Sequence, residues 1–158
     1  MQAPTLQRAV DLRETVKDVI DQKGQSIWSI SPDASVFDAI ATMSEKHVGA
    51  LVVLSAGRLV GIITERDYAR KVILKGRQSR ETKVREIMSA PVMSVTPDQT
   101  IGECMHIMTS RQIRHLPVVE NDRVSGIVSI GDLVNWIVRA QDDTIRHLHN
   151  YIAGSYPG

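Results

Sequence analysis

Cysteine is almost absent from this chain of 158 residues, which contains only Cys104. A single cysteine excludes an intramolecular disulfide and favours a reducing compartment. No apolar run approaches the roughly 20 residues that a membrane-spanning helix needs. The N-terminal residues also lack the apolar core of a signal peptide. The sequence therefore predicts a cytoplasmic protein without a membrane segment.

An excess of charge of one sign is missing as well, because 19 Lys and Arg residues face 18 Asp and Glu residues, for a net charge of +1. This balance provides no overall attraction to nucleic acid or to a membrane surface. The histidines and Cys104 form no cluster with metal-ligand spacing, and we expect Cys104 to lie on the buried face of a helix. No Gly-rich phosphate loop or Ser-His-Asp order stands out. The sequence thus predicts no metal site and no catalytic residues.

The chain does contain an internal repeat. The segment Gly61-Ile-Ile-Thr-Glu-Arg-Asp67 is matched 65 residues later by Gly126-Ile-Val-Ser-Ile-Gly-Asp132. The same offset relates residues 27–33 to residues 92–98, and an offset of 68 relates residues 16–20 to residues 84–88. Because the matching segments keep the same order over most of the chain, we interpret them as two copies of one structural unit.

Each copy is predicted to be a β-α-β-β-α unit of about 60 residues. In the first copy the pattern indicates a strand at 27–30, a helix from residue 35, a hairpin of 50–54 with 58–63, and a second helix after Asp67. The expected boundaries are an N-terminal helix and first repeat in 1–76, a polar linker in 77–83, a second repeat in 84–140 and a helical tail in 141–158. Such small units bury both faces of a sheet poorly. The predicted fold class is therefore α+β, with the two repeats packed sheet to sheet about a pseudo-twofold axis.

Each repeat has a Ser/Thr-x-x-Asp motif where a strand meets a helix, and this junction has two interpretations. In the first, Thr64 with Asp67 and Ser129 with Asp132 are capping boxes that satisfy free N–H groups of the helix. In the second, the helix N-terminus faces a phosphate and the carboxylate accepts hydrogen bonds from ribose hydroxyls. The position of both motifs in a duplicated unit, near an expected cleft between repeats, favours a ligand.

The ordered, duplicated set of motifs resembles tandem cystathionine-β-synthase (CBS) domains, the pair known as a Bateman module. The resemblance covers roughly residues 14–140 and depends on Ser31-Pro32, Thr96-Pro97, the hairpins, Arg114-His-Leu-Pro-Val118 and the two junctions. It implies a regulatory module that binds adenosine-containing ligands. AMP is the first expectation, and ADP, ATP, NAD and S-adenosylmethionine are further candidates.

The resemblance also implies two ligand sites. In one site, Asp132 would bind the ribose, Ser129 would lie near the phosphate, Ile127 would pack on the adenine, and the remaining residues would be Ser31, Val36, Val48, Gly49, Arg114 and His115. In the other site the corresponding residues would be Asp67, Thr64 and Ile62, completed by Arg66, Thr96, Ile101, Gln112 and Ile113. Because Arg114-His115 in the second copy stands where the first has Gly49-Ala50, we do not expect two equal sites.

The resemblance also implies a homodimer, because Bateman modules often pair into dimers. The tail is expected to contribute, since it continues an apolar stripe through Ile145, Leu148, Tyr151 and Ile152 that a small domain need not bury. A helix folded back on its own domain is the alternative. The leading functional prediction is a non-enzymatic signal-transduction module for energy sensing, with an effector protein that the sequence does not identify. The alternative is a scaffolding dimer that binds no nucleotide, in which both junctions are only helix caps.

Overall fold

The computed structural model describes residues 13–24 and 26–152, so the first part of the expected N-terminal helix lies outside the described residues. The chain divides into two compact units. We call the first the helical unit; it takes the described residues within Met1–Gly24, Pro97–Arg114 and Val128–Gly158. The second, which we call the sheet unit, takes those within Gln25–Thr96 and His115–Ile127.

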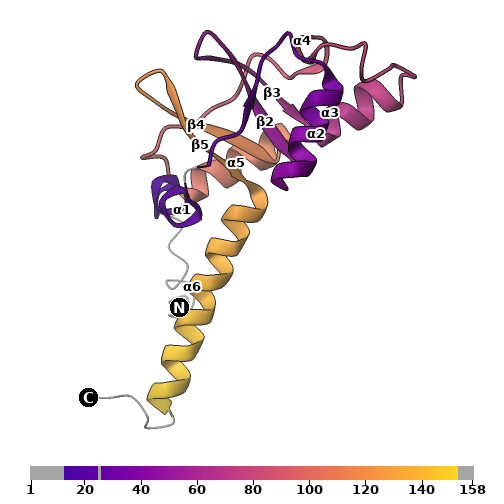
Figure 1. Cartoon of the computed structure of the whole chain (residues 1–158). Coiled ribbons are helices and arrows are strands. Elements are labelled where there is room, and N and C mark those ends of the chain that lie inside the picture. Colours follow the sequence, from indigo (N-terminus) through magenta and orange to yellow (C-terminus); the bar gives the residue numbers. More distant parts are fainter. Residues whose placement is uncertain (1–12, 25, 153–158) are drawn as a thin grey trace. The chain divides into compact units, whose positions relative to one another are not determined.

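A three-stranded sheet, ordered β1-β2-β3, organises the sheet unit. Strand β1 (Ser29–Ile30) runs parallel to β2 (Ala50–Ser55), and β2 pairs antiparallel with β3 (Arg58–Thr64). Figure 1 shows β2 and β3 side by side, as expected for the predicted hairpin. The turn between them has Gly57 at φ 78°, a left-handed conformation that costs glycine little. Strands β4 (His115–Glu120) and β5 (Arg123–Ser129) form the corresponding two-stranded sheet.

Helix α2 (Val36–Lys46) provides the buried apolar face that packs with β2 and β3. Val36, Ala39 and Met43 recur at helical spacing and join a core that also contains Leu51, Val53, Ile63, Val72, Val84 and Ile87. Ser35 caps the helix by accepting a hydrogen bond from the N–H of Asp38 at 3.1 Å. The helix ends at His47, which is left-handed with φ 56°. The predicted helix face is therefore confirmed as a core element.

The segment 77–83, expected to be a polar linker, also closes the start of α2. The N–H groups of Val36 and Phe37 donate to the carbonyls of Thr82 (2.8 Å) and Ser79 (3.0 Å). The guanidinium of Arg80 lies 3.7 Å from the centre of the Phe37 ring. Because free N–H groups at a helix start need acceptors, these carbonyls give the segment a structural role that its polar composition did not reveal.

Helix α3 (Glu65–Tyr68) begins directly after β3 and continues as the π-helix η2 (Ala69–Ile73). Helix α4 (Val84–Ile87) follows the 77–83 segment. The strand expected at residues 92–95 is reduced to one parallel bridge between Val95 and Val118. Pairing in this part of the second repeat is thus shorter than the sequence pattern predicts.

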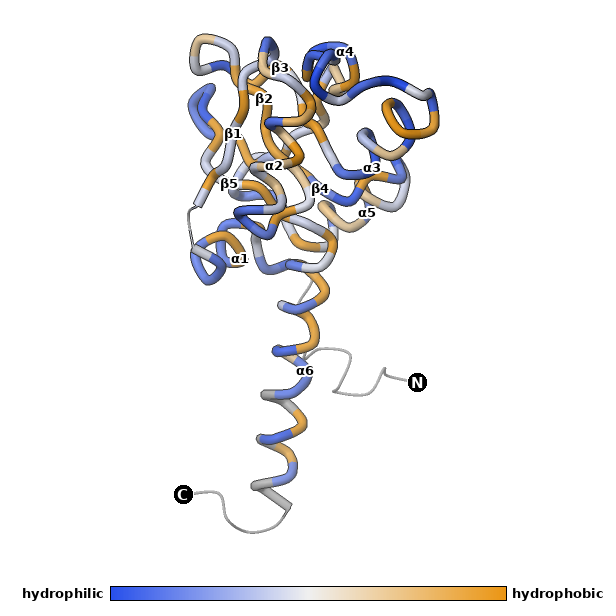
Figure 2. The backbone as a smooth tube through the Cα atoms, turned by 45° about the vertical axis from the view of Figure 1, so that its right-hand side comes forward, coloured by the Kyte–Doolittle hydropathy of each residue, from blue (hydrophilic) through white to orange (hydrophobic). Residues whose placement is uncertain are grey.

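Three helices make up the helical unit: α1 (Val16–Lys23), α5 (Ile101–Arg111) and α6 (Ile130–Ile152). Helix α6 passes without a break through residue 140, where we expected the tail to begin. Its exposed apolar side chains are Val134, Val138, Ile145 and Leu148. Figure 2 shows apolar positions recurring along α6 between hydrophilic ones. The side chains of Tyr151 and Ile152, also expected in this stripe, lie outside the described residues.

The backbone repeats the duplication seen in the sequence. The N–H of Glu65 donates to the carbonyl of Gly49 at 3.1 Å, and Ile130, 65 positions later, donates to Arg114 at 2.8 Å. The helix that precedes each hairpin ends in a left-handed residue, His47 in one copy and Gln112 in the other. The fold thus contains mixed helix and strand in two tandem repeats, as predicted.

The segments that begin the two repeats are exchanged. Thr15, just before α1, forms a bridge with Thr100 at the start of α5, which belongs to the second repeat. Lys83, just before α4, forms the same kind of bridge with Ser35 at the start of α2, in the first repeat. The opening segment of each repeat therefore pairs with the start of a helix in the other repeat. The domain boundaries predicted from the sequence remain a prediction.

Candidate functional site

The first Thr-x-x-Asp junction is a closed capping box at the end of β3. The backbone N–H and the hydroxyl of Thr64 donate to Oδ2 of Asp67 at 3.0 and 3.1 Å. The N–H of Asp67 donates to the hydroxyl oxygen of Thr64 at 3.1 Å. These reciprocal bonds satisfy free N–H groups of the helix start. The capping interpretation therefore describes the geometry of this junction.

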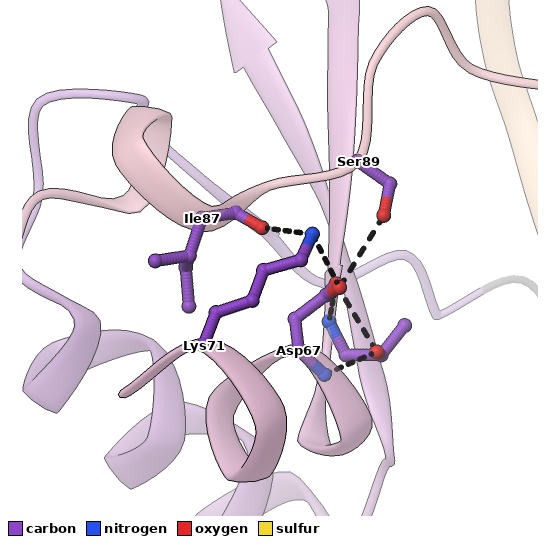
Figure 3. Close-up of polar contacts among 5 residues, drawn as sticks. Asp67, Lys71, Ile87 and Ser89 are labelled. Carbon is purple, nitrogen blue, oxygen red and sulfur yellow. Dashed lines mark hydrogen bonds and ion pairs between the residues drawn. The ribbon is translucent and has the colours of Figure 1, made fainter. Parts of the chain in front are cut away.

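The other carboxylate oxygen of Asp67 is also occupied. Figure 3 shows Lys71 and Ser89 converging on it from two directions. The ammonium of Lys71 lies 3.0 Å from Oδ1, and the hydroxyl of Ser89 donates to Oδ1 at 3.3 Å. Lys71 is held in place by a second bond, 2.9 Å to the carbonyl of Ile87. With a side chain only 10% exposed, Asp67 is a buried carboxylate with partners on both oxygens.

The segment after α4 lies directly against β3, beside this carboxylate. Ser89 and Ile62 exchange backbone hydrogen bonds of 2.8 and 3.2 Å. Gly61 is close to Met88, since a Cβ built on Gly61 would lie 2.5 Å from the Met88 sulfur. Only glycine permits so close an approach at this position. Ile62, which we expect to contact adenine, is thus a buried strand residue beside the exchanged segment.

The second junction has the same cap but a more open carboxylate. The N–H of Ser129 donates to Oδ2 of Asp132 at 2.8 Å, and the N–H of Asp132 donates to the Ser129 hydroxyl oxygen at 3.1 Å. Lys23, the last residue of α1, donates to the same Oδ2 at 2.7 Å. The Asp132 side chain is 23% exposed, and the bonds from the Ser129 N–H and from Lys23 both go to Oδ2, which leaves Oδ1 outside these two bonds. This oxygen can accept a hydrogen bond from a ligand.

The electrostatics of the second junction favour the ionised carboxylate. Burial alone would raise the pKa of Asp132, but the hydrogen bonds from Lys23 and from the Ser129 backbone outweigh it and lower the pKa below its ordinary value. The charge of Lys23 acts in the same direction. Asp132 is therefore an anionic acceptor at neutral pH, as a ribose-binding carboxylate must be.

The residues predicted for the ligand sites divide between the two units. The sheet unit contains Ser31, Val36, Val48, Gly49, Ile62, Thr64, Arg66, Asp67, Thr96, His115 and Ile127. The helical unit contains Ile101, Gln112, Ile113, Arg114, Ser129 and Asp132. Val36 and Ile101 are fully buried core residues, each at the start of a helix. Ligand contacts for all of these residues remain predictions.

Within the units, the structure does bring some predicted residues together. A Cβ on Gly49 would lie 3.7 Å from the His115 ring, so these two residues, 66 positions apart, are neighbours in the sheet unit. The same Cβ would lie 3.0 Å from the carboxylate of Glu65. In the helical unit, the bond between Ile130 and the carbonyl of Arg114 places Arg114 beside the start of α6. Arg114 is exposed there, next to Ser129.

Three side chains at the junctions escaped the sequence analysis: Lys71, Ser89 and Lys23. Lys71 follows Asp67 by four residues, a spacing typical of ion pairs on a helix, so the sequence did contain a signal for it. Lys23 is 109 positions from Asp132, and no local pattern relates the two. Ser89 reaches Asp67 only because the opening segments of the repeats are exchanged.

The cysteine thiol, metal binding and membrane insertion are other candidate features of this chain. Cys104 is fully buried on α5, as predicted, and burial raises the pKa of its thiol to about 11. In the described part of the chain, no three His, Cys, Asp or Glu residues gather in a metal-binding arrangement. None of its helices has the length and apolar character needed to cross a membrane.

Comparison with known proteins identifies the family to which this chain belongs. The CBS domain family matches residues 16–73 and 84–139. The chain belongs to the CBS-domain family. It is 41% identical over 152 residues to the mitochondrial CBS domain-containing protein CBSX3 of Arabidopsis thaliana, a match covering 90% of this chain and 73% of the relative. The predicted family and fold class are thereby confirmed.

Two solved CBS structures extend the comparison. One is a protein with CBS domains from Burkholderia ambifaria, to which a role in signal transduction is ascribed; it is 44% identical, with a TM-score of 0.76 over 79% of this chain and 94% of that one. The other is the CBS domain pair of protein MJ0100 in complex with 5′-methylthioadenosine and S-adenosyl-L-methionine. It is 26% identical, with a TM-score of 0.69 over 77% of this chain and 94% of that one.

Proposed function

We propose that this CBS pair is a regulatory module that binds an adenosine-containing ligand through Asp132. The observation that carries the proposal is the partly exposed, ionised carboxylate of the second junction, whose Oδ1 lies outside the bonds from Lys23 and the Ser129 N–H. A family member of known structure holds two adenosine compounds, which supports the same ligand class for this chain. No catalytic role is proposed.

The two junctions are proposed to differ in readiness for a ligand. Both oxygens of Asp67 already have partners, and its side chain is less exposed than that of Asp132 (10% against 23%). A ribose at Asp67 would have to replace Ser89 or Lys71, whereas a ribose at Asp132 finds one acceptor ready. The exposed Arg114 stands near the second junction, while the uncharged Gly49 takes its place at the first. We therefore assign the first binding event to Asp132, with AMP as the leading candidate.

Regulation would follow from unequal affinity for two conformations, since a ligand shifts an equilibrium only by its differential binding. We propose a homodimer as the responding assembly, with the exposed apolar residues of α6 contributing to its interface. The effector protein and the link to energy sensing remain part of this proposal. A cytoplasmic location also stays a prediction, because the Arabidopsis relative is named as mitochondrial.

One set of observations favours the alternative, a scaffolding dimer without nucleotide. Both carboxylates take part in helix caps, and both are paired with a lysine, so each already has a structural role. In that case, replacing Asp67 or Asp132 would lower the thermal stability, and no added nucleotide would change the size of the effect.

A thermal-shift panel separates the two functions. AMP, ADP, ATP, NAD, NADH and S-adenosylmethionine would each be added at millimolar concentration, and denatured protein would be checked for co-purified nucleotide by mass spectrometry. A ligand at one hundred times its dissociation constant adds about 2.7 kcal/mol, which raises Tm by roughly 5–10 °C at this chain length. The proposal predicts such a rise for at least one adenosine ligand, and its loss in Asp132→Asn. A flat panel on nucleotide-free protein refutes the proposal and leaves the scaffold.

A further inference from the structure

A lysine ammonium lies on each junction carboxylate, and duplication does not explain why. Lys71 reaches Asp67 from the π-helix η2, in the same repeat. Lys23 reaches Asp132 from α1, the exchanged opening segment of the other repeat. The residue 65 positions after Lys71 is Trp136, which donates instead to the carboxylate of Glu14. Two unrelated lysines thus pair with equivalent carboxylates, Lys71 on the oxygen outside the helix cap and Lys23 on the oxygen within it.

The ammonium of Lys23 lies where a ribose would have to bind. A carboxylate oxygen has about two lone-pair positions, and Oδ2 of Asp132 already accepts from the Ser129 N–H and from Lys23. A ribose offers two adjacent hydroxyls, and when each bonds a different oxygen of the carboxylate, one takes Oδ1 and the other needs a place on Oδ2. The Ser129 bond belongs to the helix cap, and Lys23 is the partner that can leave. Binding therefore separates Lys23 from its carboxylate.

From this competition, we infer that Lys23 makes the Asp132 site selective for adenosine ligands with a 5′-phosphate over uncharged adenosine. The inference rests on the proposed function and names the ligand class within it. A displaced ammonium loses its contact with the Asp132 carboxylate, and a phosphate would supply another anion close to the ribose. Uncharged adenosine breaks the same ion pair and offers nothing in return. Lys23 has a flexible four-carbon stem and is 36% exposed, so it can follow the phosphate without unfolding α1.

The expected size of the selectivity follows from ordinary hydrogen-bond strengths. A bond to a charged group contributes enough to change affinity about 10- to 100-fold. An ion pair as exposed as that of Lys23 and Asp132 opposes adenosine by about two- to fivefold at most. Removing the ammonium should therefore weaken AMP binding more than it strengthens adenosine binding. The ratio of the two affinities should fall at least about tenfold.

The test measures AMP and adenosine affinities by isothermal titration calorimetry in the wild type, Lys23→Met and Lys23→Arg. Lys23→Met removes the charge and keeps an unbranched side chain, whereas Lys23→Arg keeps the charge. The matched control is Lys17→Met on the same helix, which removes the same charge from an exposed pair with Asp21 at 2.6 Å. Thermal melting confirms that each variant is folded, and Asp132→Asn identifies the binding phase that belongs to this site.

The inference predicts a strong preference for AMP in the wild type, Lys23→Arg and Lys17→Met, and a ratio reduced about tenfold or more in Lys23→Met. An unchanged ratio in Lys23→Met, with AMP binding still dependent on Asp132, overturns the inference and leaves the proposed function intact. Equal losses in Lys23→Met and Lys17→Met also overturn it, since they would reflect only net charge. Failure of the wild type to bind either compound refutes the proposed function itself, and the inference with it.

Discussion

Replacing Lys71 with Met tests whether the contacts around Asp67 stabilise the fold as the structure implies. The change removes two contacts of the ammonium, 3.0 Å to Oδ1 of Asp67 and 2.9 Å to the carbonyl of Ile87. Methionine keeps much of the apolar stem, so the loss should come mainly from these polar contacts. Asp67, with a side chain only 10% exposed, would lose its contact with the Lys71 ammonium.

The expected loss of stability in Lys71→Met lies between the values for a buried and for an exposed ion pair. Breaking a fully buried ion pair by removing one partner costs about 3–5 kcal/mol, while an exposed pair contributes about 0–1 kcal/mol. Lys71 is 44% exposed, and Asp67 keeps its bonds from Thr64 and Ser89, so the pair falls between these limits. We expect Lys71→Met to lower the free energy of unfolding by about 2 kcal/mol. That loss corresponds to roughly 4–8 °C in Tm for a chain of this size.

Urea unfolding followed by circular dichroism measures this loss, with Lys75→Met as the control. Lys75 is an exposed lysine four residues further along the chain, and its replacement should change stability by less than about 0.5 kcal/mol. Repeating Lys71→Met in an Asp67→Asn background isolates the pair. The effect of Lys71→Met should then shrink by about 1 kcal/mol or more. Equal losses in both backgrounds would show that Lys71 and Asp67 do not interact, and would refute the reasoning.

Three further predictions concern other parts of the molecule. Gly61→Ala should destabilise the protein by about 1–3 kcal/mol, because the new Cβ would lie 2.5 Å from the Met88 sulfur; a wild-type urea midpoint would contradict the close approach. Cys104 should resist thiol reagents at pH 8 and react fully in denaturant, because burial raises its pKa to about 11 and no other cysteine is present; rapid labelling of folded protein would show that it is not buried. Combining Ile145→Glu with Leu148→Glu should convert the proposed homodimer to monomer in sedimentation, because both side chains are exposed on α6; a dimer unchanged by the two substitutions would place the interface elsewhere, and a monomeric wild type would refute the proposed homodimer.

Much of the fold could be predicted because it follows from local sequence patterns, namely apolar spacing and the internal repeat. Helix α2 and the hairpin follow from apolar spacing that the structure confirms in Val36, Ala39 and Met43. The duplication predicted equivalent junctions, and the same caps appear at Thr64 and Ser129. Sequence periodicity records which face of an element is buried, so these features could be predicted before the structure was known.

The exchange of opening segments was not predictable, because it is a choice between two partners of similar sequence. Residues 16–20 and 84–88 look alike, and either could pack on α2 or α5. The same limit applies to the ion pair of Lys23 and Asp132, which depends on that exchange. The carbonyls of Ser79 and Thr82 that close the start of α2 are backbone groups, and residue type says little about them. These contacts are long-range, and only the folded chain defines them.

Calorimetric titration of nucleotide-free protein with AMP, in the wild type and in Asp132→Asn, tests whether the protein binds an adenine nucleotide through Asp132. Asparagine keeps the shape of the side chain and removes the ionised acceptor; Asp21→Asn, on the exposed face of α1, is the matched control. The account predicts saturable AMP binding in the wild type and in Asp21→Asn, and an affinity at least about tenfold weaker in Asp132→Asn. Binding that is identical in all three proteins would contradict the role of Asp132, and the absence of any binding would contradict a nucleotide-binding function.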